Sequence, residues 1–413
     1  MSEKTTLQNG ENNVRKYSTM MTIICGFMLS MGAIHMDTIN WILPTIAKEL
    51  ASGNSTLMVT SGFFYGMMIG HLLVGPISDM IGKKKTMLLG FVICIVGAVI
   101  GANSHALGGL IAARLIQGFG GAATSNAARA TGGDAGKGKA SAMALTFMQV
   151  FSGAIPIILP LSGKWVGNAF GWAAIFWLQA IICGVLCILM LIFVEETSTT
   201  SGKGCFQRMG VEIKSCLLTP EYVLFTLCFA FNMALFFCYA GSASFAMVTE
   251  LGMDNGAYAN MYAINAATMV VGASLGRVLS QRVAPGTLVR SLNVLQLVFA
   301  AFISIMFMTG SATWQMLQFV WWVFPFIQGI TLPVAMSLVM NASGKTTGTG
   351  AAFMGFVQYL FSSITTTMLA SIKETGSVGG TIGWLMAACA VLSFITCTLG
   401  VNILKKKDPD AVG

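Results

Sequence analysis

Two ionisable side chains, Asp37 and Arg114, stand inside long apolar stretches of this 413-residue chain. A charged group inside a bilayer costs roughly 2.5 to 3.5 kcal/mol, so such groups are candidates for function. A carboxyl group at Asp37 can hold a proton while its surroundings are dry and release it when a cation approaches. The chemistry that this residue can offer is therefore reversible proton binding.

Arg114 is the expected partner of Asp37, because an unpaired guanidinium in an apolar stretch is equally costly. Gln117 follows Arg114 by about one helical turn and shares its face. A fixed positive charge beside Asp37 would delay protonation until the pair separates, which makes the pair a candidate switch. The alternative is a static ion pair that only pins two helices together.

The residues around Asp37 follow a helical spacing. Steps of 4, 3, 4 and 3 connect the small and polar residues Gly26, Ser30, Ala33, Asp37 and Asn40. This spacing predicts a single helical face that lines a central cavity. His35 falls away from this face, and we expect it to be packed or interfacial.

The composition predicts an all-α polytopic membrane protein. Hydrophobic residues make up 55% of the chain, charged residues make up 9%, and the mean hydropathy is +0.77. A crossing needs about 20 apolar residues. By this criterion the chain has twelve crossings, over residues 19–44, 56–78, 86–102, 107–127, 140–161, 172–194, 222–248, 257–279, 288–309, 314–340, 351–372 and 383–404.

A polar stretch divides these crossings into two halves. The expected organisation is an N-terminal tail over 1–18, a six-helix bundle over 19–194, a linker over 195–219, a second bundle over 220–404 and a C-terminal tail over 405–413. Nineteen of the 23 Lys and Arg residues lie in the tails, the even-numbered loops and the helix ends beside them, against three in odd-numbered loops. This asymmetry predicts that both tails and the linker are cytoplasmic in a multi-pass inner-membrane protein. The net charge of +8 is then explained by contact with anionic lipid and not with nucleic acid.

A short basic loop after the second crossing has a recognisable pattern. It consists of Gly75, Asp79, Gly82, Lys83 and Lys84. The pattern resembles Gly-x-x-x-Asp-Arg-x-Gly-Arg-Arg/Lys of the major facilitator superfamily, with Met80 in place of the first basic residue. The resemblance implies a gating role, and Asp79 is expected to accept hydrogen bonds from a neighbouring helix N-terminus. The alternative is a loop that only sets topology.

Further segments carry the same resemblance. Residues 114–122 resemble the superfamily's Arg-x-x-Gln-Gly-x-Gly-Gly-Ala motif, and Pro160-x-x-Gly163 resembles an antiporter signature that here lacks its outer glycines. Residues 239–245 and 262–266 resemble the Bcr/CflA group of drug exporters. The likeness extends over about residues 26–404. It implies two pseudo-symmetric six-helix bundles, drug/proton antiport, and a coupling role for Asp37 and Arg114.

Amide and aromatic side chains on several predicted helices are candidates for a substrate cavity. They are Asn40, Gln117, Asn232, Phe236, Tyr239, Asn265, Gln318, Trp322 and Gln358. Together with 28 methionines, such groups would form an adaptable pocket for a lipophilic or amphipathic small molecule. The alternative is that they pack helices against one another.

No signature of an enzyme is present in the sequence. The three histidines are too far apart for a helical metal pair, the ten cysteines lack metal or disulfide spacing, and no phosphate-binding loop of an ATPase occurs. We therefore expect a monomeric, non-enzymatic transporter with no catalytic residues, no metal and no cofactor except the proton as coupling ion. Proton-coupled export is the main expectation. The alternatives are a proton-coupled importer of a metabolite and a non-transporting membrane receptor or assembly partner.

Overall fold

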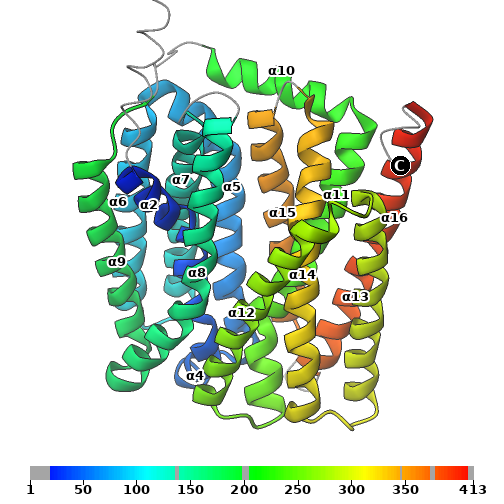
Figure 1. Ribbon diagram of the computed structural model, residues 1–413. Coiled ribbons are helices and arrows are strands. Elements are labelled where there is room, and N and C mark those ends of the chain that lie inside the picture. The colour runs from blue at the N-terminus through cyan, green and yellow to red at the C-terminus, as the bar shows by residue number, and fades with distance from the viewer. Residues whose placement is uncertain (1–18, 135–138, 198–203, 345–346, 373–376, 408–413) are drawn as a thin grey trace, which may run out of the picture.

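The computed structural model describes residues 19–134, 139–197, 204–344, 347–372 and 377–407, so the predicted tail over 1–18 lies outside the described residues. Long helices stand side by side and nearly parallel (Figure 1), and the described residues contain no strand. The first half of the chain occupies one side of Figure 1 and the second half the other. The predicted all-α fold is confirmed.

The helices of the first half are α2 (Thr19–Leu29), α3 (Met31–Asp37), α4 (Leu43–Glu49), α5 (Met58–Ile81), α6 (Lys83–Ala102), α7 (Leu107–Gly133), α8 (Lys139–Phe170) and α9 (Trp172–Phe193), with short 3-10 turns η1 (Asn40–Ile42) and η2 (Gly53–Leu57). The helices of the second half are α11 (Pro220–Ser244), which continues as the π-helical η3 (Phe245–Glu250), α12 (Asn255–Leu279), α13 (Pro285–Met308), α14 (Trp314–Ala342), α15 (Thr347–Ala370) and α16 (Val378–Lys407). Between the halves lies α10 (Cys205–Leu217).

These helices account for the predicted crossings. Within the described residues, eight helices are long and apolar enough to span a membrane, or nine if the bent first span is included. The remaining three, α7, α8 and α15, have 27, 32 and 24 residues. At 1.5 Å per residue each is longer than the roughly 30 Å hydrocarbon layer. The chain is therefore a multi-pass membrane protein.

The first span is broken, although the sequence predicted one helix over 19–44. The segments before and after Ser30 meet at an angle of 43°, and a second interruption follows Asp37. Two local features explain this second interruption. Thr38 Oγ1 donates to the Ile34 carbonyl at 2.8 Å, which competes with the backbone hydrogen bonds of the helix. Pro44 prevents a continuous helix through Asn40, four residues earlier, because proline lacks an N–H and its ring clashes with the preceding turn. The predicted polar stripe is thus not one straight helical face.

One end of the molecule, at the top of Figure 1, carries the start of α6 and the end of α16. Both segments are rich in lysine, and we call this end the basic end. Two helical segments lie there in regions that were predicted only as tail and linker. The helix α16 runs through Lys407 and so continues into residues 405–407 of the predicted tail. The predicted linker contains α10, which lies across the basic end and is joined to α15 by a hydrogen bond from Thr349 Oγ1 to Glu212.

Close glycine contacts show that the two halves are built alike. A Cβ atom added to Gly118 of α7 would lie 2.1 Å from the Phe63 carbonyl oxygen of α5. In the second half, a Cβ atom on Gly329 of α14 would lie 2.1 Å from the Met269 carbonyl oxygen of α12. The same glycine-mediated crossing of the second and fourth spans therefore occurs in both bundles.

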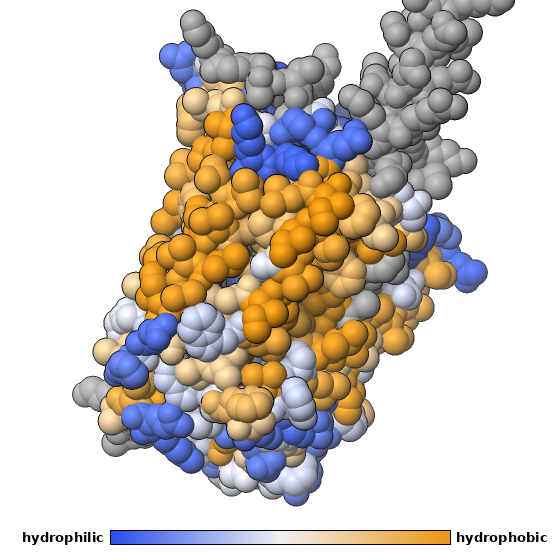
Figure 2. Space-filling model, turned by 90° about the vertical axis from the view of Figure 1, so that its left-hand side faces the viewer, coloured by the Kyte–Doolittle hydropathy of each residue, from blue (hydrophilic) through white to orange (hydrophobic). Residues whose placement is uncertain are grey.

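The outer surface is apolar between two polar ends. Figure 2 shows a broad hydrophobic band with hydrophilic residues gathered above and below it. Large side chains such as Ile181, Val271 and Val298 are about 60% exposed in the middle of their helices, at 62%, 60% and 58%. Such a band would be unfavourable in water and matches the hydrocarbon layer of a membrane.

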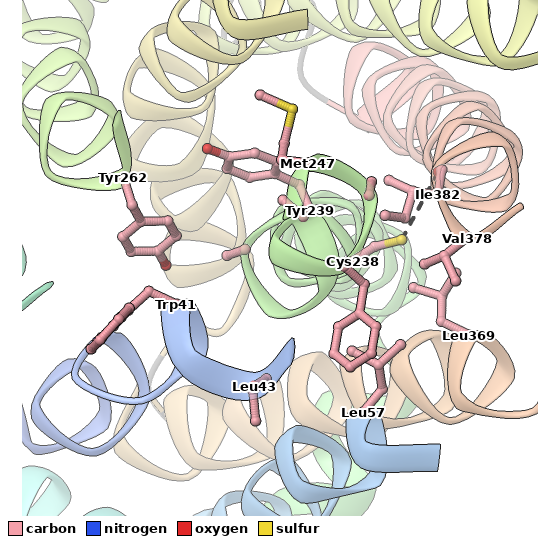
Figure 3. Packing of buried hydrophobic residues seen from close by; sticks show 14 of the residues in the cluster. Trp41, Leu43, Leu57, Cys238, Tyr239, Met247, Tyr262, Leu369, Val378 and Ile382 are labelled. Carbon is pink, nitrogen blue, oxygen red and sulfur yellow. Dashed lines mark hydrogen bonds between the residues drawn. The ribbon is translucent and has the colours of Figure 1, made fainter. Parts of the chain in front are cut away.

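The two halves meet in a hydrophobic cluster at the end opposite the basic end. Figure 3 shows Trp41, Leu43 and Leu57 of the first half packed near buried residues of the second half. Asn54 Nδ2 also donates to the Ile372 carbonyl, at 3.3 Å, between η2 and the end of α15. The molecule is therefore in a conformation whose halves are in contact at this end.

Candidate functional site

Asp37 lies at the last residue of α3, where the first span breaks, and is 9% exposed. The hydroxyl of Tyr262, on α12 in the other half, donates to Asp37 Oδ1 at 3.0 Å. No salt bridge to Asp37 occurs among the described residues. This acid therefore connects the two halves through one neutral hydrogen-bond donor.

Arg114 is fully buried and does not pair with Asp37, so the predicted ion pair is absent from this conformation. Its Nη1 donates to the His35 carbonyl at 2.7 Å and to Gln117 Oε1 at 3.1 Å. Its guanidinium carbon lies 4.8 Å from the centre of the Phe63 ring, a cation–π contact. Nε and Nη2 have no hydrogen-bond partner among the described residues.

The position of Arg114 follows from the break in the first span. The last carbonyl groups of a helix lack intrahelical donors, and the C-terminal end carries partial negative charge. The break leaves the His35 carbonyl in this position, and Arg114 supplies a donor together with Gln179 Nε2 at 3.2 Å. Arg114 thus caps the helix that ends in Asp37 and holds that residue in place.

Gln179 was missed by the sequence analysis. Its Nε2 donates to Thr38 Oγ1 at 2.6 Å as well as to His35, and its Oε1 accepts from Gln117 Nε2 at 2.9 Å. A signal was available, because Gln179 is the one amide side chain in the apolar run 172–193. A single polar side chain in such a run needs a partner inside the bundle.

The partly matching antiporter signature on α8 packs directly on the break. A Cβ atom on Gly163 would lie 2.5 Å from the Thr38 carbonyl oxygen and 3.1 Å from Trp41 Nε1. The Trp41 indole nitrogen itself donates to that carbonyl at 2.9 Å. Glycine at position 163 therefore leaves room for the irregular backbone that follows Asp37.

Four predicted cavity residues lie in contacts around this region. Asn40 Nδ2 donates to the Ala240 carbonyl of the other half at 3.1 Å, and Asn265 Nδ2 donates to the Tyr239 hydroxyl. The ring of Tyr239 packs 5.6 Å from Trp321 and 5.5 Å from Phe324, centre to centre. The ring of Phe236 lies 6.5 Å from Tyr239 and extends this aromatic cluster. The cluster belongs to the second half, which also provides Tyr262.

Other predicted cavity residues are placed differently. Gln117 bonds to Gln179 within the first bundle, and Asn232 Nδ2 donates to Ser393 Oγ at 2.5 Å within the second. On α14, Trp321 and not Trp322 meets Tyr239, because the helix is rotated about one residue from the predicted face. The structure records no side-chain hydrogen bond for Gln318, Trp322 or Gln358 among the described residues.

The predicted gating loop is shorter than expected. The helix α5 continues through Gly75 and Asp79 to Ile81, and α6 begins at Lys83. The single connecting residue, Gly82, has φ = +96°, which favours glycine. Asp79 is exposed and accepts no hydrogen bond among the described residues, so this conformation shows no capping contact for it.

Glu196, at the end of the sixth span, takes the role predicted for Asp79. Its carboxylate accepts from the backbone N–H groups of Lys83 and Lys84 at 3.0 and 3.1 Å. The side chain of Lys83 forms a salt bridge with Asp134, which also accepts from Thr197 Oγ1 at 2.6 Å. These contacts tie the ends of three spans together at the basic end.

Replacing Glu196 with Ala should remove the cap of α6 and destabilise the first bundle by about 1 to 2 kcal/mol. Thermal unfolding of the purified protein in detergent measures this loss. The matched control is Glu195→Ala, because Glu195 is exposed next to Glu196 and the structure records no contact for its carboxylate. Equal stability of the two variants would contradict the capping role.

Comparison with known proteins now identifies the fold. The sequence profile described as Major Facilitator Superfamily matches residues 20–366, which is most of the chain. The chain belongs to the major facilitator superfamily. The predicted family, and with it the two-bundle fold, is thereby confirmed.

Relatives of this superfamily member include drug-resistance proteins. A "Bicyclomycin resistance protein homolog" of Haemophilus influenzae is 24% identical over 383 residues, covering 89% of this chain and 94% of that protein. "Multidrug resistance protein MdtL" of Klebsiella pneumoniae (strain 342) is 25% identical over 382 residues, covering 90% and 94%. The "Uncharacterized MFS-type transporter YdgK" of Bacillus subtilis is 23% identical over 399 residues, covering 94% and 97%.

Solved structures agree at the level of the fold. A D-xylose-proton symporter superposes with a TM-score of 0.69 at 13% identity, covering 92% of this chain and 95% of that chain. A bacterial homolog of the human lysosomal transporter Spinster superposes with a TM-score of 0.70 at 12% identity, covering 95% and 97%. This superfamily member is therefore a membrane transporter by fold and family.

Proposed function

We propose that this transporter exports drugs or other small amphipathic compounds in exchange for protons. It would do so in the inner membrane, with its basic end facing the cytoplasm. The observation that carries the proposal is the hydrogen bond from Tyr262 to Asp37. It places a buried, unpaired carboxyl group at the contact between the two halves. A proton on this group changes the interaction between the halves directly.

The mechanism follows from the acceptor strength of the carboxyl group. A charged Asp37 accepts a strong hydrogen bond from Tyr262 and holds α3 against α12. Protonation removes the charge, weakens this bond and favours separation of the halves. Arg114 keeps the end of α3 in position through the His35 carbonyl, so Asp37 returns to the same partner after each cycle.

The surroundings of Asp37 favour a lipophilic or cationic substrate. Tyr239, Tyr258 and Tyr262 are all at most 7% exposed, and their rings lie on the side of the second half. Aromatic faces attract organic cations, and a carboxylate adds charge attraction. A substrate that reaches this cluster competes with the proton for Asp37, which couples the two fluxes. The drug-resistance names of the relatives are consistent with this class of substrate.

The energy of a proton gradient is sufficient for such export. A potential of about 100 mV supplies roughly 2.3 kcal/mol per charge. One pH unit adds about 1.4 kcal/mol. Inward movement of one proton can therefore sustain a gradient of a neutral substrate of a few hundredfold, without ATP.

Substrate-triggered proton release in proteoliposomes tests the proposal. Lipophilic cations and neutral antibiotics are added to purified protein in sealed vesicles with an internal pH indicator. Antiport predicts that substrate and protons move in opposite directions. Movement in the same direction would instead establish the importer, and binding without any flux would establish a non-transporting receptor.

Replacing Tyr262 with Phe should shift the pH dependence of transport. The variant keeps the ring but removes the hydroxyl that donates to a charged Asp37. A hydrogen bond to a charged group contributes about 1.5 to 3 kcal/mol, so the half-maximal pH should rise by about 1 to 2 units. Tyr258→Phe is the control, because the Tyr258 hydroxyl has no partner among the described residues. An unchanged pH profile in Tyr262→Phe would refute the role of this bond.

A further inference from the structure

Three side chains that can bind a metal meet inside the first bundle, away from the contact between the halves. They are His35 of α3, Cys94 of α6 and Cys183 of α9, and all three are 0% exposed. Their ligand atoms all lie within 4.8 Å of one another, and His35 Nε2 is 3.8 Å from Cys183 Sγ. The sequence spacing predicted no metal site, because these residues come from three separate helices.

The hydrogen bonds of Gln179 orient the imidazole for metal binding. Gln179 Nε2 donates to the His35 carbonyl, which can only accept, so the other amide atom must be the oxygen. This Oε1 lies 3.4 Å from His35 Nδ1, and Nδ1 must therefore carry the proton. The lone pair is then on Nε2, the nitrogen that faces Cys183. Metal-binding histidines typically donate a hydrogen bond from the ring nitrogen that does not bind the metal, as Nδ1 does here.

The spacing of the three ligand atoms suits a small ion with three ligands. Metal–sulfur and metal–nitrogen bonds of about 2.3 and 2.0 Å place the ligand atoms roughly 3.5 to 4 Å apart. The distance of 3.8 Å between His35 Nε2 and Cys183 Sγ already has this value. Cys94 Sγ, which lies 3.7 Å from the Gln117 carbonyl oxygen, completes the set from a third helix.

The charge of Arg114 selects the valence of the ion. Its guanidinium is fully buried, lacks a carboxylate partner among the described residues and bonds to the His35 carbonyl. Two thiolates and one monovalent ion carry a net charge of −1, which Arg114 balances. A divalent ion would leave the positive charge of Arg114 uncompensated in an apolar interior, which is unfavourable.

We propose that His35, Cys94 and Cys183 form a binding site for a soft monovalent metal ion of the Cu(I) or Ag(I) type. Soft thiolate ligands select such ions, and imidazole is compatible with them. Binding forms two metal–sulfur bonds and one metal–nitrogen bond, releases the two thiol protons and involves no change of oxidation state. The bound ion ties α3, which ends in Asp37, to α6 and α9.

The test is retention of Ag(I) by the purified full-length protein in chloride-free buffer. Excess glutathione removes silver from single thiols, the protein is desalted, and bound silver is measured by elemental analysis. We expect about one Ag(I) per wild-type chain, and none in the Cys94→Ala/Cys183→Ala variant. His35→Asn should weaken retention about 10- to 100-fold or more. Excess Zn(II) should not displace the silver.

A matched control is available in the second bundle. Cys228 and Cys397 are also buried and lie in one hydrophobic cluster, but the second half contains no histidine. Cys228→Ala/Cys397→Ala should therefore retain silver like the wild type. Equal retention in both double variants, or displacement by Zn(II), would overturn the proposal.

A spectroscopic measurement needs only the wild-type protein, so it does not depend on whether a variant folds. X-ray absorption of the wild-type protein loaded with Cu(I) should show two sulfur atoms and one nitrogen atom around the metal. A single sulfur ligand, or an absence of nitrogen, would overturn the assignment. This experiment also leaves the proposed proton coupling untouched, since it measures no transport.

Discussion

Replacement of Asp37 with Asn is expected to reduce substrate-triggered proton release at least about 100-fold. A positioned proton-transfer group contributes about 100-fold or more to the rate, and this contribution would be lost. Asparagine has the same shape and can still accept a hydrogen bond from Tyr262 through its carbonyl oxygen. It cannot bind and release a proton. The fold should therefore persist, with the bond from Tyr262 weakened as it is by protonation, while coupling is lost.

Two measurements separate lost coupling from lost structure. Exchange of labelled for unlabelled substrate across the vesicle needs no net proton movement, so we expect it to survive in Asp37→Asn. The matched variant is Asp254→Asn, which removes the same charge from a residue that caps α12 through Ala257 N at 2.9 Å. Asparagine caps helices as well as aspartate does. Unchanged proton release in Asp37→Asn would show that Asp37 is not the proton carrier.

Substitution of Gly118 by Ala should be the most destabilising of the small substitutions. The added Cβ would lie 2.1 Å from the Phe63 carbonyl oxygen and 2.9 Å from the Met67 backbone nitrogen. Both contacts are to backbone, so no side-chain rotation relieves them, and α5 and α7 must separate. Overpacking of this kind costs about 3 kcal/mol or more. We expect a large drop in the thermal unfolding temperature and in the yield of monodisperse protein.

The control lies on the same helix. Gly108 of α7 has no atom within 4 Å of an added Cβ, so Gly108→Ala should be neutral or stabilise the helix by up to about 1 kcal/mol. Gly329→Ala should resemble Gly118→Ala, because Gly329 makes the equivalent crossing in the second half. Equal stability of Gly118→Ala and Gly108→Ala would contradict the close helix contact.

The sequence was most informative about properties that belong to single residues or to one helix. Hydropathy and chain length predicted the spans, and the polar stretch before α11 marked the division into halves. Asp37 and Arg114 were recognised because a charge in an apolar run is conspicuous on its own. The packed state of His35 followed from its place off the polar stripe, and the structure confirms it.

The tertiary structure decided which of these groups meet. Asp37 bonds to Tyr262, 225 residues away, and Arg114 caps a helix end that exists only because the first span breaks. Such pairings depend on helix rotation, helix breaks and the docking of two halves, and no local spacing encodes these. For the same reason Glu196 took the capping role predicted for Asp79, and three residues without metal spacing met in one bundle.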